Sequence, residues 1–169
     1  MHAPAIAGNS VLLLLRLVLG GLFVFAGSLK IADPQAFAFA IKGYDLLDPV
    51  GQGGLMAWLA FALPWTEVIS GALLVVGARP RAAATVVAGL LAVFTGGYVS
   101  VLARGMSVEC GCFGSSEFLC SGPIAACHLV RNGVMLAAAV LLAVGGGGYL
   151  AMDAKPAGEP AEDPEDDVM

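Results

Sequence analysis

Charged residues are scarce in this chain of 169 residues: they make up 12% of it, while hydrophobic residues make up 59%. A soluble domain has about 25% charged and roughly 45–50% apolar residues, so this composition excludes an ordinary soluble domain. The apolar residues gather in runs of about 20, the length that spans a bilayer. The sequence therefore predicts an integral membrane protein.

Basic residues are also few, eight lysines and arginines against thirteen acids, and they form no surface that would bind nucleic acid. The net charge of −5 arises at one end of the chain. From Asp153 onward seven acidic residues accompany one lysine, so this part carries −6 and the remainder +1. Pro156, Pro160 and Pro164 lie among these acids, and we expect residues 149–169 to form a disordered acidic tail.

Four apolar runs predict four membrane-spanning helices, and thus an all-α integral membrane four-helix bundle over residues 11–148. The predicted spans are Val11 to about Ala32, about Leu55 to Val76, about Ala82 to Ala103, and near Ile124 to near Val144. The first run is too long for a signal-peptide core and lacks a clear cleavage site. We therefore expect it to remain as a span, preceded by a short cytosolic segment at residues 1–10.

A short interfacial helix is expected directly after the first span. Asp33 is a good N-cap residue, and Pro34 suits the first helical position. Phe37, Ile41 and Tyr44 follow at helical spacing. The segment is too short to span the bilayer and fits an amphipathic helix on its surface.

Small residues recur every seven positions on two of the predicted spans. The first span has Gly20 and Gly27, and the third has Ala82, Gly89, Gly96 and Ala103. Small residues on one face allow helices to approach closely in lipid. The alternative is that glycine and alanine are simply frequent in this chain.

Cysteine is limited to four residues, all between the third and fourth spans or at the start of the fourth: Cys110, Cys112, Cys120 and Cys127. A Cys110–Cys112 disulfide would close a very small ring, and a strained disulfide is labile. Such a bond would also remove little entropy from the unfolded chain, so the pair is predicted to exchange disulfides. Two alternatives remain open. Each cysteine of the pair could form a structural disulfide with Cys120 or Cys127 that cross-links the loop, or the cysteines could form a soft-metal site.

The metal interpretation would add His128 to the four cysteines. Zinc sites more often have two to four residues between paired cysteines, so the single intervening glycine argues against zinc, and no metal ligand is assigned. Copper or mercury transfer stays open. His128 alone is more typical of an interfacial polar residue, although a protonated imidazole would favour a Cys127 thiolate.

Cys120 and Cys127 are predicted to form a second pair. Cys127 falls at the start of the fourth span, where a helix N-terminus favours a thiolate. This second pair either relays oxidising equivalents to Cys110 and Cys112 or forms a fixed cross-link that shapes the loop.

Charged residues within the spans need partners, because a charge at the bilayer centre costs about 2.5–3.5 kcal/mol on insertion scales. Glu67 lies near the middle of the second span, and Arg131, followed by Asn132, lies about two turns into the fourth. We expect Glu67 to pair with Arg131. The pair would either orient the helices or form a polar layer beneath the cysteine loop that tunes its thiolates or a bound quinone. Lys30 and Arg16 are expected to extend toward the membrane surfaces.

Topology is indicated by charge and by the cysteines. The turn between the second and third spans carries Arg79 and Arg81, and the opposite side carries Lys42 and Arg104 among acids, so the lysine–arginine bias alone decides little. Disulfides persist outside the cytosol. We therefore expect the cysteine loop to be extracytoplasmic and both termini to be cytosolic.

Several short motifs occur together along the membrane part of the chain. They are Ala26-Gly27-Ser28-Leu29-Lys30, Asp33-Pro34 with Phe37, Leu63-Pro64 with Glu67 and Gly71, Arg104-Gly105, Cys110-Gly111-Cys112-Phe113-Gly114 and Arg131-Asn132. In these the chain resembles the MauE family of methylamine-utilisation membrane proteins, within the wider DoxX-like group, over about Arg16 to Leu142. Cys110 to Gly114 is the most specific motif, and Cys120 and Cys127 are not part of the pattern.

The resemblance implies four membrane helices in a bacterial plasma membrane and a role in maturing exported disulfide-containing proteins, such as the small subunit of methylamine dehydrogenase. It also implies a thioredoxin-like extracytoplasmic partner and a thiol–disulfide exchange activity at Cys110 and Cys112. A membrane quinone is one candidate electron carrier, and no other cofactor is expected. The alternatives are a non-catalytic membrane assembly factor and a soft-metal carrier.

Overall fold

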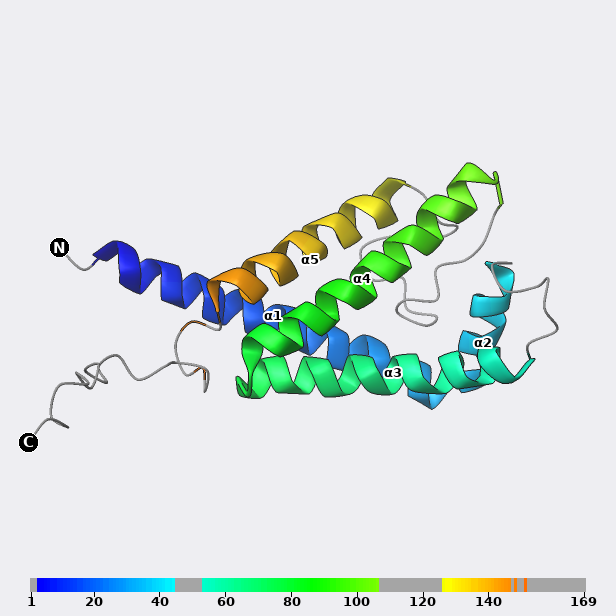
Figure 1. The fold of residues 1–169 in the computed structure, drawn as a ribbon, viewed down its shortest axis with the longest axis horizontal. Helices are drawn as coiled ribbons and strands as arrows, with labels where there is room; N and C mark the ends of the chain where they lie inside the picture. Colours follow the sequence, from blue (N-terminus) through cyan, green and yellow to red (C-terminus); the bar gives the residue numbers. More distant parts are fainter. Residues whose placement is uncertain (1–2, 45–52, 107–125, 147, 149–150, 152–169) are drawn as a thin grey trace, which may run out of the picture.

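The computed structural model describes residues 3–44, 53–106, 126–146, 148 and 151, and these residues form helices and turns without any strand. The five helices are α1 (Ala3–Ala32), α2 (Pro34–Gly43), α3 (Gly53–Val76), α4 (Pro80–Ala103) and α5 (Ala126–Gly145) (Figure 1). The predicted all-α class is confirmed.

Four of these helices contain a stretch long and apolar enough to cross a membrane: Asn9–Ala32, Ala57–Val76, Pro80–Ala103 and Ala126–Gly145. They coincide with the four predicted spans to within a few residues, so the chain is a multi-pass membrane protein. One boundary differs from the prediction, since α1 begins at Ala3 rather than at Val11. The expected acidic tail lies almost wholly outside the described residues.

The predicted short helix after the first span is present as α2. The Asp33 carboxylate accepts a hydrogen bond from the backbone N–H of Ala36 at 3.0 Å, and Pro34 occupies the first turn. This satisfies one of the backbone donors that a helix start leaves unpaired. Phe37 is buried and anchors α2 to the rest of the bundle.

The spans form two helix pairs that share one core. The most extensive contacts join α1 to α3 and α4 to α5. In Figure 1, α3 and α4 meet at their short connecting turn and diverge from it. The shared core is made of aliphatic, phenylalanine and alanine side chains from all four spans: Leu19, Phe23, Leu74, Ala83, Ala84, Val87, Leu91, Ala139 and Leu142.

The turn between α3 and α4 follows from its local sequence. Gly77 has a φ of 81° and its N–H donates to the Leu73 carbonyl at 2.9 Å, which closes the end of α3. Glycine is the residue that most readily takes this left-handed conformation after a helix. Pro80 then starts α4 at the position where a missing N–H costs nothing.

Glycines bring the backbones of α1 and α3 into direct contact. A Cβ atom built at Gly20 would lie 2.8 Å from the Gly71 carbonyl oxygen, and one at Gly71 would lie 2.7 Å from the Gly20 oxygen. One at Gly27 would lie 2.8 Å from the Pro64 oxygen. The small residues of the first span therefore serve close packing, as predicted.

No described helix packs against the small residues of the third span. Ala82, Gly89, Gly96 and Ala103 are all exposed, and a Cβ at Gly89 or Gly96 would meet no described atom within 4 Å. The packing role predicted for this face is therefore wrong within a single chain.

Candidate functional site

The buried polar side chains of the bundle gather toward one end. Because α4 ends there and α5 begins there, the connecting residues 107–125, which carry Cys110, Cys112 and Cys120, leave from this end and return to it. These three cysteines lie outside the described residues. The candidate site is therefore the part of the bundle next to the cysteine segment.

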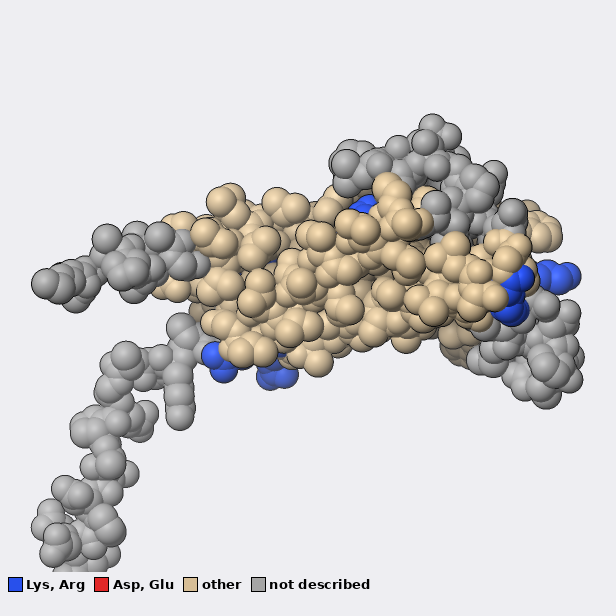
Figure 2. Space-filling model, turned by 90° about the horizontal axis from the view of Figure 1, so that it is seen from above, with Lys and Arg blue, Asp and Glu red and all other residues tan. Residues whose placement is uncertain are grey.

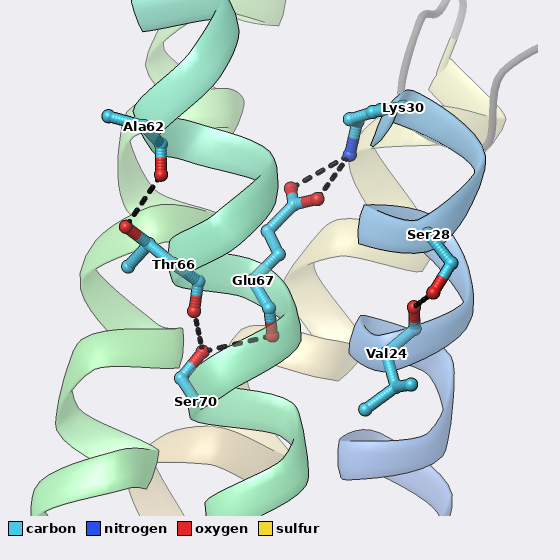
Figure 3. A network of polar contacts seen from close by, with 7 residues as sticks. All are labelled: Val24, Ser28, Lys30, Ala62, Thr66, Glu67 and Ser70. Carbon is cyan, nitrogen blue, oxygen red and sulfur yellow. Dashed lines mark hydrogen bonds and ion pairs between the residues drawn. The ribbon is translucent and has the colours of Figure 1, made fainter. Parts of the chain in front are cut away.

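An ion pair between α1 and α3 lies at the centre of this region. The Lys30 Nζ atom donates to both carboxylate oxygens of Glu67, at 2.8 and 2.7 Å (Figure 3), and both side chains are 2% exposed. Two expectations are thereby wrong: Lys30 does not extend toward the membrane surface, and the partner of Glu67 is Lys30 rather than Arg131. Arg16, also 2% exposed, does not extend outward either.

Aromatic rings complete the surroundings of the Lys30 ammonium. The ring centres of Phe37 on α2 and Phe94 on α4 lie 5.4 and 5.5 Å from its Nζ atom. At such distances the negative ring face attracts a cation. One lysine thus links α1 to three other helices, which explains how a charge is accommodated in the core.

A second polar contact links α4 to α5 nearby. The Asn132 side-chain amide donates to the Thr95 hydroxyl oxygen at 3.1 Å, and that hydroxyl donates to the Leu91 carbonyl at 2.6 Å. Asn132 is 3% exposed, whereas the adjacent Arg131 is half-buried. Asn132 therefore links α5 to α4 through a partly buried hydrogen bond.

A small cavity separates the two polar contacts. It measures about 20 Å³ and is bordered by Lys30, Glu67 and Asn132 together with apolar side chains. This is room for about one water molecule, which needs roughly 10–15 Å³ by the same measure. A quinone ring does not fit in this cavity.

An aromatic cluster joins the end of α2 to α4 and α5. Tyr98 is fully buried, with its ring 6.4 Å from that of Tyr44 and 6.3 Å from that of His128, in an edge-on arrangement with the latter. His128 is 1% exposed, so the expectation of an interfacial histidine is wrong. The imidazole packs inside the bundle one residue after Cys127.

Arg104 fastens the end of α4 to the end of α2. Its Nε atom donates to the Ser100 carbonyl at 3.1 Å, and its guanidinium also donates to the Tyr44 carbonyl. Arg104 therefore helps to hold the Tyr44 ring against Tyr98. Arg104, part of the Arg104-Gly105 motif, therefore joins two helices at the end of the bundle where α4 stops.

Cys127 is disulfide-bonded, and its partner lies outside the described residues. It occupies the first turn of α5 and is exposed. The structure thus contains Cys127 in a disulfide and not as the predicted thiolate. Within the described residues, no three or more histidine, cysteine or acidic side chains gather as a metal site would require.

Sequence reasoning missed Tyr44, Tyr98, Phe94 and Thr95 as parts of this region. A signal was present for the tyrosines, since the chain has only three and two of them meet here. A buried tyrosine usually has a polar partner, so a tyrosine in an otherwise aliphatic span marks a polar neighbourhood. Phe94 and Thr95 have no such sequence signal.

Comparison with known proteins gives one match. The family model described as methylamine utilisation protein MauE matches residues 8–145, which include all four spans and the complete cysteine segment. No curated protein and no solved structure matches the chain.

Proposed function

Since this chain belongs to the MauE family of methylamine utilisation proteins, we propose that it is a membrane thiol–disulfide exchange protein. It passes disulfides or electrons between a thioredoxin-like extracytoplasmic partner and the membrane. Its clients are exported proteins that mature by forming disulfides, such as the small subunit of methylamine dehydrogenase. Cys110 and Cys112 are the exchanging pair in this proposal.

The observation that carries the proposal is the disulfide at Cys127. It lies at the start of α5, one residue before the buried His128, whose ring contacts that of Tyr98. A cysteine that is in a disulfide is not available as a thiolate ligand, so this observation favours disulfide chemistry, as exchange or as a fixed cross-link, over a soft-metal site that uses Cys127.

In the proposed site the cysteines react, and the buried polar residues of the helices position them. The Asn132–Thr95 contact joins α4 to α5, the two helices that the cysteine segment connects, and the Lys30–Glu67 pair joins α1 to α3 within the same bundle. In this proposal these residues position the cysteines and do not themselves react. Cys120 and Cys127 form the second pair, as a relay or as a fixed cross-link.

The proposed orientation places the cysteine segment outside the cytosol and both termini inside. Four spans return the chain to its starting side, and the α3–α4 turn lies on that same side. That turn exposes Arg79 and Arg81, while the opposite side exposes Lys42 and Arg104, so the orientation is proposed from the cysteines, since disulfides persist outside the cytosol. The proposed location is the plasma membrane of a bacterium.

Trapping of mixed disulfides tests the exchange. A Cys112→Ser variant, expressed in cells that contain the thioredoxin-like partner, should accumulate a covalent complex through Cys110 that disappears on reduction. Cys110→Ser and the double variant are the matched controls, and the double variant should trap nothing. If none of the variants yields a complex and client disulfides still form normally, the chain is an assembly factor without exchange activity.

Labelling with a membrane-impermeant thiol reagent tests the orientation. After mild reduction of intact cells, the wild-type chain should be labelled in the cysteine segment and the variant lacking Cys110 and Cys112 should be labelled less. Labelling that requires permeabilised cells would reverse the orientation.

A further inference from the structure

A groove runs between α3 and α4 at the end of the bundle opposite the cysteine segment. It measures about 560 Å³ and is lined on α3 by Ile69 and Leu73, on α4 by Ala82 and Val86, and at the turn by Arg79. In Figure 1, α3 and α4 diverge from their shared turn, because the main partner of α3 is α1 and that of α4 is α5. Alanine at position 82 leaves the space between them open.

The walls of the groove favour a hydrocarbon chain. Ile69, Leu73 and Val86 are 55%, 40% and 44% exposed, so apolar surface faces the space. The two hydroxyl groups in the groove bond within their own helix: Thr66 donates to the Ala62 carbonyl at 2.7 Å and Ser70 to the Thr66 carbonyl at 2.6 Å (Figure 3). No polar occupant is therefore required along the length of the groove.

The mouth of the groove is positively charged. Arg79 is exposed, and no acidic residue occurs from Leu74 to Met106 to offset it or Arg81. In Figure 2 the helical body is almost entirely uncharged, with the larger groups of lysine and arginine toward its ends. Arg79 also has a φ of 48°. This left-handed backbone conformation is energetically unfavourable for any residue with a Cβ atom, and glycine would adopt it more easily.

We propose that this groove binds one anionic phospholipid. The acyl chain lies between α3 and α4, and the guanidinium of Arg79 holds the negatively charged headgroup. Basic residues at the membrane surface attract anionic lipids, and the groove supplies the complementary apolar contact. The site is separate from the cysteine segment and does not depend on the proposed redox function.

Native mass spectrometry of the purified full-length protein tests the headgroup contact. With added phosphatidylglycerol the wild-type protein should carry one bound lipid, and phosphatidylcholine should bind more weakly. Arg79→Gln should reduce phosphatidylglycerol binding about fivefold, the effect of one surface cation. The control is Arg81→Gln, which removes the same charge two residues away, outside the groove lining, and should retain most of the binding.

A second pair of variants tests the acyl-chain contact. Ala82→Phe should fill the groove and reduce binding of both lipids, whereas Ala92→Phe, at an exposed position of α4 outside the groove, should not. Equal losses in the two arginine variants, or equal binding of the two lipids, would overturn the headgroup contact. Unchanged binding in Ala82→Phe would overturn the groove as the site.

Discussion

The two helix pairs of the bundle are held together by different means. Between α1 and α3, glycine backbones touch at Gly20 and Gly71, and one buried ion pair joins Lys30 to Glu67. Between α4 and α5, the glycines Gly89, Gly96 and Gly133 make no such close contact with the described residues, and Asn132 donates a neutral hydrogen bond to Thr95.

This difference indicates where the fold tolerates change. Backbone contact leaves no space for a side chain, and a buried charge has no substitute for its partner, so the α1–α3 interface requires particular residues. An interface of apolar side chains can repack around a substitution of similar volume. We therefore expect single changes to be costly at α1–α3 and mild at α4–α5.

The largest effect is expected from breaking the ion pair. Lys30→Met should lower the free energy of unfolding by about 3–5 kcal/mol, because Glu67 would keep a buried charge without its partner. SDS titration of the purified protein in mixed micelles measures this change. Lys42→Met, at an exposed position on α2, is the control and should have little effect.

The double variant Lys30→Met, Glu67→Met decides whether the two charges act as a pair. It should be less destabilised than the sum of the single variants, since neither charge remains. Additive losses would mean that the two side chains contribute independently.

The next largest effect concerns the glycine contact. Gly20→Leu should cost about 1–3 kcal/mol or more by forcing the helices apart, because its Cβ would lie 2.8 Å from the Gly71 oxygen. Gly21→Leu provides an adjacent control, since a Cβ there meets nothing within 4 Å. Similar unfolding free energies for the two variants would contradict close backbone packing.

A smaller effect is expected at α4–α5. Thr95→Val removes the acceptor for Asn132 while keeping the side-chain shape, and should cost about 0.6 kcal/mol and at most about 1.7 kcal/mol, as for other hydrogen bonds between membrane helices. A double-mutant cycle with Asn132→Leu isolates the pair. A coupling as large as that of Lys30 and Glu67 would remove the contrast between the two interfaces.

The smallest effect is expected on the outer face of α4. Gly89→Leu and Gly96→Leu should each change the unfolding free energy by less than about 0.5 kcal/mol, the usual range for surface positions. Both glycines are exposed and have free space at the Cβ position. A large loss in either variant would show that another molecule packs against this face.

Sequence patterns predicted the helices better than their partners. The four spans and the Asp33 cap were predictable because hydropathy and capping are local properties of the chain. The partner of Glu67 was not, because Lys30 and Arg131 were both near enough in depth to compete. The outcome depends on which helix α3 packs against, and the close approach of Gly20 to Gly71 brings α1, with Lys30, beside it.

The seven-residue pattern of small residues shows the same limit. On α1 it marks a contact, because α3 presents Gly71 to Gly20. On α4 the same pattern remains exposed, because no described helix presents a complementary surface. The aromatic cluster around Tyr98 was also not predictable, since it joins residues of α2, α4 and α5 that are far apart in the sequence.

The ion pair also has a consequence for biogenesis. Lys30 leaves the ribosome 37 residues before Glu67, so α1 is synthesised while its ammonium has no counter-charge. A lysine so near the end of a helix can reach the membrane surface while it is unpaired, so we expect the ammonium to leave water only when α3 arrives. Burial of Lys30 would then accompany the docking of α3 against α1 as a late step of assembly.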